Sequence, residues 1–164
     1  MGLCPERRPA LNRRPPAILP QEKAITPVSN QQNVQIVTDF FTALADGDTR
    51  RLFALTAEDI EWAIPGQDWP LAGTYRGHAG LTTLLQKASD TIETTFPQPL
   101  EFIAQGDRVL VIGFSRGKVK ATNRTFEDHF VWAITVRNGQ LAKIREYVDT
   151  QALARASEGN ANHT

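Results

Sequence analysis

The feature that most constrains the fold is a pair of strand-like segments joined by Asn138-Gly139. Every second residue of the first segment, TFEDHFVWAITV (residues 125–136), is apolar with one exception, and the second segment, QLAKIREYV, begins directly after the glycine. Alternation with a period of two is typical of a strand with one buried face. Asparagine and glycine both tolerate positive φ, so this pair favours a two-residue hairpin turn. We therefore expect two long antiparallel strands near the C-terminal end of the chain.

One acidic residue interrupts the apolar face of the first strand. Every second side chain from Phe126 to Val136 is apolar except that of Asp128. A two-residue turn, continued without interruption, places Asp128 opposite Asp149 on the same face of the sheet. Two carboxylates placed in this way repel each other unless one is protonated or a cation lies near. A three-residue loop with a bulge at Gly139 would shift the register by one residue, and the sequence leaves both registers open.

Helix signals precede most of the strand signals along the chain. Helix signals cover residues 34–44, 50–55 and 78–92, and further strand signals cover residues 57–65, 99–105 and 108–116. A last short helix can begin near Gln151. Helices first and a strand meander later are typical of an α+β fold, in which helices cover one face of a curved antiparallel sheet.

Length and composition indicate one domain flanked by tails. A chain of 164 residues is long enough for a single core. Residues 1–29 hold six of the ten prolines and no aromatic residue, which predicts an extended or disordered tail. Alternatively, translation begins near Val28. We expect the folded domain to span residues 30–156 and residues 157–164 to form a flexible C-terminal tail.

Charge and cysteine content argue against several functional classes. The formal net charge is zero, so no global field recruits nucleic acid or an anionic membrane surface. No run approaches the roughly 18 apolar residues of a membrane-spanning helix. The one cysteine, Cys4, cannot form a disulfide within the chain, which fits a reducing, cytoplasmic location. Three scattered histidines and the lack of a phosphate-binding loop predict neither a metal site nor a cofactor.

Three stretches of the chain carry a family resemblance. LTAEDIEWAIPG, PLAGTYRGHAGL and FVWAITVRNGQLAKIREYVDT resemble the SnoaL-like proteins, which belong with ketosteroid isomerases, polyketide cyclases, limonene-epoxide hydrolase and nuclear transport factor. The resemblance covers residues 32–155. It implies a cone, in which a curved antiparallel sheet and about three helices enclose a pocket, and it implies homodimers formed through the convex face of the sheet. One scaffold serves many tasks in this group, so the resemblance predicts the fold better than the activity.

The resemblance also assigns roles to the acidic residues. The closing REYVD is similar to the segment in which the epoxide hydrolase carries a pocket aspartate, which implies that Asp149 lines the pocket. In this hypothesis Asp149 is the acid–base group and Asp128 tunes its pKa. The polyketide cyclases add a pocket histidine, a role that His129 could fill, although alternation places His129 on the face opposite Asp128. In the alternative interpretation, Asp149 lies in solvent or caps the following helix, and Asp128 neutralises Arg145 or Arg124.

Two family activities lack their required residues in this sequence. The epoxide hydrolase needs an arginine and an aspartate two positions apart on a strand that here reads VIGFS, residues 111–115. The steroid isomerase base corresponds to the neighbourhood of Trp62 and Ala63, and its neutral oxyanion-binding acid to that of Trp132. Neither position carries a carboxylate, so both mechanisms are disfavoured.

Aromatic residues are the candidates for the ligand-binding wall. Trp62, Trp132 and Phe114 could line a pocket or could be plain core residues. Trp69 lies in a loop rich in proline and glycine and could cover the pocket mouth. Two further candidates, Tyr75 and Arg76, belong to the family-like GTYRG stretch, where Arg76 could contact a ligand or an interface.

The sequence therefore predicts a small pocket protein with two possible functions. The first is isomerase- or cyclase-type proton transfer on a small, mostly apolar carbonyl compound. The second is a non-enzymatic small-molecule-binding or dimeric interaction module on the same fold. A homodimer interface on the convex face should include His129, Val131, Ala133 and Ile144.

Overall fold

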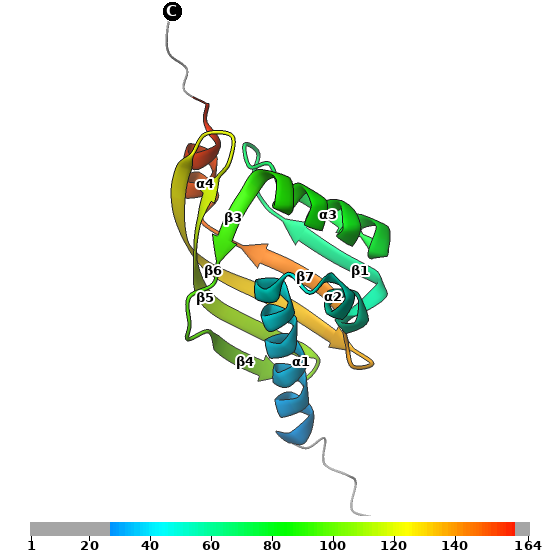
Figure 1. Cartoon of the computed structure of the whole chain (residues 1–164). Coiled ribbons are helices and arrows are strands. Elements are labelled where there is room, and N and C mark those ends of the chain that lie inside the picture. The colour runs from blue at the N-terminus through cyan, green and yellow to red at the C-terminus, as the bar shows by residue number, and fades with distance from the viewer. Residues whose placement is uncertain (1–26, 160–164) are drawn as a thin grey trace, which may run out of the picture.

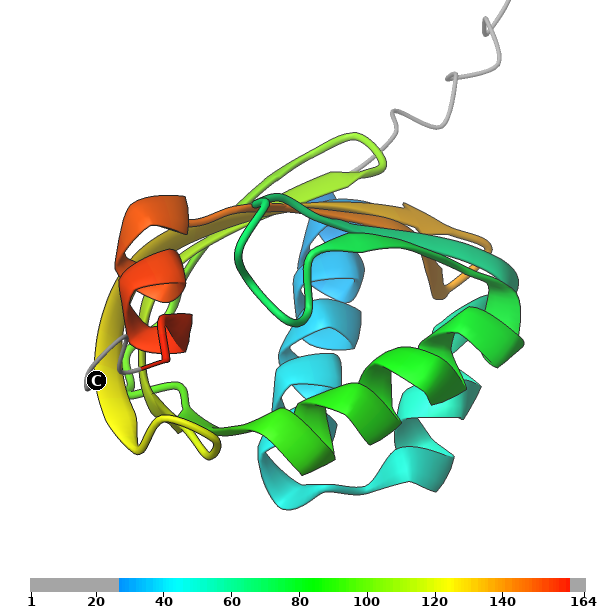
Figure 2. The same ribbon diagram turned by 90° about the horizontal axis from the view of Figure 1, so that it is seen from above.

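The chain forms a strongly curved sheet with helices packed against its concave side (Figures 1 and 2). The computed structural model describes residues 27–159. Residues 1–26 and 160–164 of the two predicted tails lie outside the described residues, whereas residues 27–29 belong to the first helix and not to a tail. The elements are α1 (Pro27–Asp46), α2 (Thr49–Leu55), β1 (Thr56–Ile64), β2 (Gly73–Arg76), α3 (Gly77–Thr91), β3 (Ile92–Thr95), β4 (Glu101–Gln105), β5 (Arg108–Val119), β6 (Arg124–Arg137), β7 (Gln140–Tyr147) and α4 (Thr150–Ser157). The predicted α+β class and the cone-like arrangement are confirmed.

The strands pair into a single sheet that joins distant parts of the chain. Within residues 27–159, seven strands form one sheet in the order β2-β1-β7-β6-β5-β3, and β4 also pairs with β5. Most neighbouring pairs are antiparallel, whereas β1 runs parallel to β7. Figure 2 shows the sheet arching over α1, α2 and α3, while α4 lies at one end of the arch. None of the helices over these residues is long and apolar enough to cross a membrane.

The helices form where the sequence predicts them. Apolar residues of α1 turn inward at helical spacing, and Val37 and Phe40 are completely buried. Gly47 adopts a φ of 65°, a value that glycine reaches without strain, directly after the last residue of α1. Asp48 then caps α2, because its Oδ1 accepts a hydrogen bond of 3.0 Å from the backbone N–H of Arg51. These two residues set the angle between α1 and α2.

The hairpin between β6 and β7 has the predicted two-residue turn. Asn138 and Gly139 adopt φ values of 52° and 75°, and Arg137 pairs with Gln140. The expectation of uninterrupted pairing beyond the turn is wrong. Val136 pairs with Leu141 but Thr135 pairs with Lys143, and the extra residue between them forms a bulge.

The bulge at Ala142 changes which side chains of β7 face the concave side. Without it, Lys143 and Arg145 would point into the core opposite Ile134 and Trp132. With it, Lys143 and Arg145 are exposed, and Glu146 lies opposite Trp132 instead. The same shift turns Ile144 inward, where it is 1% exposed, so its predicted place on the convex face is wrong. The bulge keeps two cations in solvent but buries one carboxyl group.

Candidate functional site

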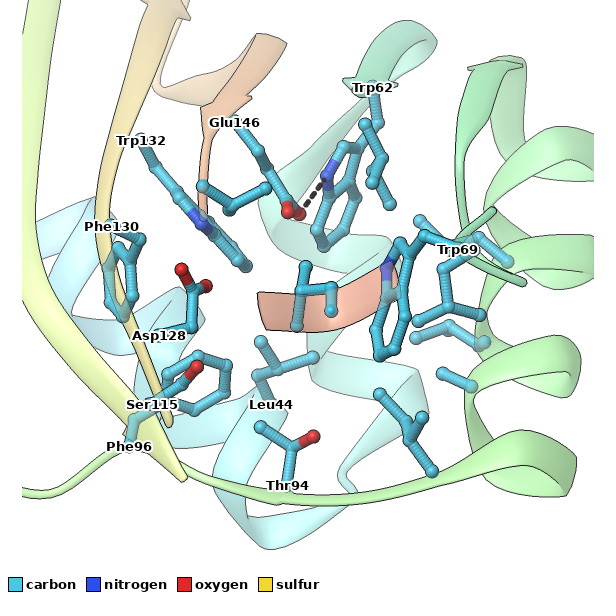
Figure 3. Close-up of a pocket in the computed structure, with 18 of the residues that line it drawn as sticks. Leu44, Trp62, Trp69, Thr94, Phe96, Ser115, Asp128, Phe130, Trp132 and Glu146 are labelled. Atoms are coloured by element: carbon cyan, nitrogen blue, oxygen red, sulfur yellow. Dashed lines mark hydrogen bonds between the residues drawn. The ribbon is translucent and has the colours of Figure 1, made fainter. Parts of the chain in front are cut away.

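The concave side of the sheet encloses a cavity of about 410 Å³ (Figure 3). Its lining side chains come from all four helices, from five of the strands and from the loops between them, and they are mostly apolar or aromatic. The lining residues Gly47, Thr49 and Ser89 are exposed, whereas Trp62, Asp128, Trp132 and Glu146 are buried. The cavity therefore opens between the α1–α2 turn and α3, and its closed end lies against β1, β6 and β7. A volume of this size is typical of small-molecule sites.

Two glycines on β5 leave room for the aromatic wall. Gly113 and Gly117 flank Ser115 on the concave face, opposite Phe130 and Phe126 respectively. A Cβ atom added at Gly113 would lie 2.5 Å from Cδ2 of Leu100 and 2.7 Å from Cζ of Phe130. The lack of side chains at these positions lets the two phenylalanine rings lie close against the sheet.

The change Gly113→Ala is expected to destabilise the fold by about 1–3 kcal/mol, because the added methyl group overpacks the wall. Urea unfolding followed by fluorescence measures the effect. Gly159→Ala is the matched control, since a Cβ atom at Gly159 meets nothing within 4 Å. An unchanged free energy of unfolding for Gly113→Ala would show that the wall is loosely packed.

Glu146 is a buried acid at the closed end of the cavity. Glu146 is 8% exposed, and its Oε1 accepts a hydrogen bond of 2.7 Å from the indole Nε1 of Trp62. Burial raises the pKa of Glu146 to about 8; the Trp62 N–H opposes this shift and the nearby Asp128 adds to it. Glu146 is therefore largely protonated at neutral pH and can donate its own O–H.

Asp128 is the second buried acid of the site. The residue is 4% exposed, and its Oδ1 accepts a hydrogen bond of 2.7 Å from the backbone N–H of Asp149. Burial raises the pKa of Asp128, and the negative charge of Asp149 raises it further. The hydrogen bond from the Asp149 N–H, the nearby His129 and the Ser115 hydroxyl each lower this pKa, but the net change is a rise. The opposing hydrogen bonds favour the ionised form, so Asp128 is the stronger acid of the two.

Two further polar atoms in the lining are buried without a hydrogen-bond partner among residues 27–159. They are the indole Nε1 of Trp132 and the hydroxyl Oγ1 of Thr94. Trp132 lies opposite Glu146 in the sheet and beside it at the closed end, as Figure 3 shows. Buried donors are usually paired, so these two atoms are positions where a ligand can bind.

The ionisable side chains in the lining are both acids, Asp128 and Glu146. Over the described part of the chain, no lysine, arginine or histidine lines the cavity. The same residues contain no group of three or more His, Cys, Asp or Glu side chains arranged to hold a metal ion. The site therefore offers an apolar space with two carboxyl groups and unpaired N–H and O–H donors.

A comparison with known protein families identifies the family of this chain. A family model described as the SnoaL-like domain matches residues 37–144, which is more than half of the chain. The chain belongs to the SnoaL-like family. This membership accounts for the cone-like sheet and the enclosed cavity, and it leaves the activity open because the scaffold serves many tasks.

Solved structures resemble this SnoaL-like chain closely. An NTF2-like protein from Burkholderia xenovorans LB400 is 63% identical, with a TM-score of 0.74, over 79% of this chain and 98% of that one. TerC, which was co-crystallised with polyporic acid, is 27% identical, with a TM-score of 0.69, over 78% of this chain and 99% of that one. An uncharacterised protein of Mycobacterium tuberculosis is 23% identical over 120 residues, 73% of this chain and 91% of the relative.

The expectation that Asp149 faces Asp128 inside the pocket of this SnoaL-like chain is wrong. Asp149 is exposed and caps α4, because its Oδ1 accepts a hydrogen bond of 2.9 Å from the backbone N–H of Ala152. The capping alternative is therefore confirmed. Its companion, a pairing of Asp128 with Arg145, is wrong because Arg145 lies on the outer face against Tyr147.

The structure brings some of the predicted ligand-binding residues to the cavity and places others elsewhere. Trp62, Trp69 and Trp132 all line the cavity. Three other candidates lie elsewhere. Phe114 packs against the exposed His129 on the outer face of the sheet. Tyr75 is buried and donates its hydroxyl to the carbonyl of Leu71, and Arg76 is exposed and pairs with Glu61. Their predicted contact with a ligand in this cavity is therefore wrong, as is that of His129.

Glu146 is a site residue that the sequence pattern did not predict. Uninterrupted pairing of β6 with β7 would have buried the cations Lys143 and Arg145 in the core. That unfavourable burial was the sequence signal that pointed to a bulge. A bulge that returns both to solvent necessarily turns Glu146 inward.

Proposed function

We propose that the cavity binds a small, mostly apolar carbonyl compound and that Asp128 and Glu146 transfer a proton on it. The observation that carries this proposal is the presence of two carboxyl groups with different environments at the closed end of an apolar cavity. Environments that separate the pKa values of two acids also separate their catalytic roles.

The two roles follow from the hydrogen bonds. Asp128, the stronger acid, removes a proton from the carbon next to the carbonyl group. The electron pair of that C–H bond forms a C=C bond as the carbonyl π electrons move to oxygen. Glu146 donates its proton to this oxygen, which gives a neutral enol. Asp128 then gives a proton, or a deuteron taken up from solvent, to carbon, and the enol O–H returns its proton to Glu146 as the carbonyl group forms again. Protonation at a different carbon moves the double bond.

One similar protein supports a small organic ligand. TerC shares the fold and was co-crystallised with an organic acid, which supports occupation of a cavity by a small organic molecule. The lining of the present cavity has no cationic side chain among residues 27–159. We therefore propose a neutral ligand here.

Hydrogen–deuterium exchange tests the proposal. The methyl protons of 4-acetylbiphenyl exchange with D₂O when the ketone enolises, and proton NMR follows their loss. We expect the protein at catalytic concentration to accelerate this exchange above the buffer rate. Binding of the ketone without any acceleration would contradict proton transfer.

A ligand-binding module without chemistry is the second candidate. It is favoured by the hydrogen bonds that both acids already make, Asp128 with the Asp149 N–H and Glu146 with the Trp62 N–H. These bonds could serve only to hold the acids in a binding site. The exchange experiment separates the two candidates.

We also propose that the chain forms a homodimer through the convex face of the sheet. This face carries exposed apolar side chains, including Tyr147 at 54% and Ile103 at 46% exposure, and His129, Val131 and Ala133 lie on it too. Burial of such a surface against a second copy would stabilise the fold.

The change Val131→Glu is expected to give monomers in light scattering, because it places a charge within the apolar face. Thr82→Glu, on the exposed surface of α3, is the control and should leave the dimer intact. A parent protein that stays monomeric at every accessible concentration would overturn the dimer proposal.

A further inference from the structure

We propose that the cavity selects an elongated, neutral aromatic ligand with an oxygen at each end. One oxygen would accept the indole N–H of Trp132 at the closed end, and the other would bind the Thr94 hydroxyl at the far side. This inference deepens the proposed function, on whose carbonyl ligand it rests, by naming the ligand class and two specificity-determining residues.

Trp132 is a rigid donor with nothing to donate to inside the described chain. The residue is 5% exposed, and its Nε1 is buried without a partner among residues 27–159. Its ring is held by neighbouring aromatic rings, with centroids 5.0 Å from that of Phe41 and 5.4 Å from that of Trp62. The Trp62 N–H, by contrast, already donates to Glu146. Since an unpaired buried donor is unfavourable, a ligand oxygen beside Trp132 gains a preorganised hydrogen bond.

Thr94 supplies the second unpaired group, well away from the first. It lies on β3 opposite Gly117, and Gly117 lies opposite Phe126 on β6. Trp132 is six residues further along the curved strand β6 than Phe126, so Trp132 and Thr94 belong to different ends of the cavity. Figure 3 shows Thr94 on the side of the cavity away from Trp132 and Glu146. One small polar group cannot reach both atoms, so the ligand must carry two.

The wall between these two ends suits aromatic rings. Phe96, Phe126 and Phe130 line the cavity there, and the glycines of β5 let two of these rings lie close to the sheet. Edge-to-face and offset contacts with such rings favour a flat ligand. An anionic ligand would lie beside the carboxyl groups Asp128 and Glu146 with no cation in the described lining to offset them. The favoured class is therefore a neutral biaryl or bicyclic compound with a ketone at one end and a hydroxyl group at the other.

A matched set of probes tests each end separately. The four compounds are 4-acetyl-4′-hydroxybiphenyl, 4-acetylbiphenyl, 4-ethyl-4′-hydroxybiphenyl and 4-ethylbiphenyl, so that the ketone and the hydroxyl group are removed singly and together. Isothermal titration calorimetry measures their affinities for the full chain and for the variants Trp132→Phe and Thr94→Val. Thr94→Val keeps the shape of the side chain, Trp132→Phe keeps an aromatic ring at that position, and each variant removes one hydrogen-bonding group.

Each oxygen should raise the affinity of the parent protein by about 3- to 10-fold, the effect of one hydrogen bond. Trp132→Phe should reduce the gain from the ketone and leave the gain from the hydroxyl group unchanged, and Thr94→Val should do the reverse. Equal gains in the parent protein and both variants would overturn the proposal. Failure of all four probes to bind the parent protein would overturn it as well.

A measurement on the parent protein covers the case of a variant that does not fold. The acetyl compounds should shift the indole N–H signal of Trp132 in a proton–nitrogen NMR spectrum, and the ethyl compounds should shift it much less. Equal shifts from both would overturn the assignment of Trp132. If the selective gains appear but the acetyl protons do not exchange with D₂O, the binding inference stands and proton transfer alone fails.

Discussion

Glu146→Gln is expected to lower the rate of ketone proton exchange by about 10²–10⁴-fold, the usual contribution of a general acid or base. The amide keeps the shape of the side chain and can still accept the Trp62 N–H, but it has no acidic proton for the ligand oxygen. Asp128→Asn should cause a loss of similar size, because it removes the base. Exchange of 4-acetylbiphenyl in D₂O, measured at saturating ketone, reports both losses.

Asp149→Asn is the control variant. It distinguishes a site built on Asp128 and Glu146 from the site predicted from sequence, in which Asp149 was the acid–base group. Asparagine caps helices about as well as aspartate, and the backbone N–H that binds Asp128 is unchanged. We expect this variant to keep most of the exchange activity. Loss of activity in Asp149→Asn with retention in Glu146→Gln would reverse the two assignments and contradict the proposed roles.

The stability of the fold is expected to fall as the pH rises from 5 to 8. The pKa of Glu146 is about 8 in the folded chain and near the ordinary glutamate value of 4.5 when the chain is unfolded. Between these values the folded state holds a proton that the unfolded state has released, so raising the pH favours unfolding. The expected contribution is about 1.4 kcal/mol per pH unit. Below pH 4.5 both states are protonated, and above pH 8 both are ionised, so the slope from this group disappears.

The comparison with Glu146→Gln isolates this contribution, because a glutamine does not titrate. Urea unfolding at several pH values between 5 and 8 should show a steep loss of stability in the parent protein and a smaller one in the variant. Asp128 contributes with the same sign over a lower pH range, since burial raises its pKa as well. Parallel stability curves for the two proteins would mean that Glu146 ionises normally in the folded state.

The elements of the fold were predictable because their signals are local. Helical spacing located α1 and α3, and Asn138-Gly139 fixed the two-residue turn that starts the hairpin. The alternation of β6 placed Asp128 and Trp132 on the concave face together. Each of these inferences needs only neighbouring residues and a known backbone period.

The acid pair was not predictable in the same way, because its identity depends on one bulge. The pattern of β7 contains no glycine or proline at Ala142 to mark an interruption. Only the cost of burying Lys143 and Arg145 against the core favours the shift, and that cost appears once the two strands are paired. The role of Asp149 as a helix cap is equally ambiguous before the path of the chain after β7 is known.

Carbon-13 NMR titration of the side-chain carboxyl groups tests whether Glu146 is a buried, protonated acid. We expect the Glu146 signal to titrate near pH 8. We also expect Asp128→Asn to lower this pKa, since the negative charge that opposes ionisation is gone. A Glu146 signal that titrates near 4.5 and does not respond to Asp128→Asn would contradict the account, because the closed end of the cavity would then hold two ordinary carboxylates and no proton donor.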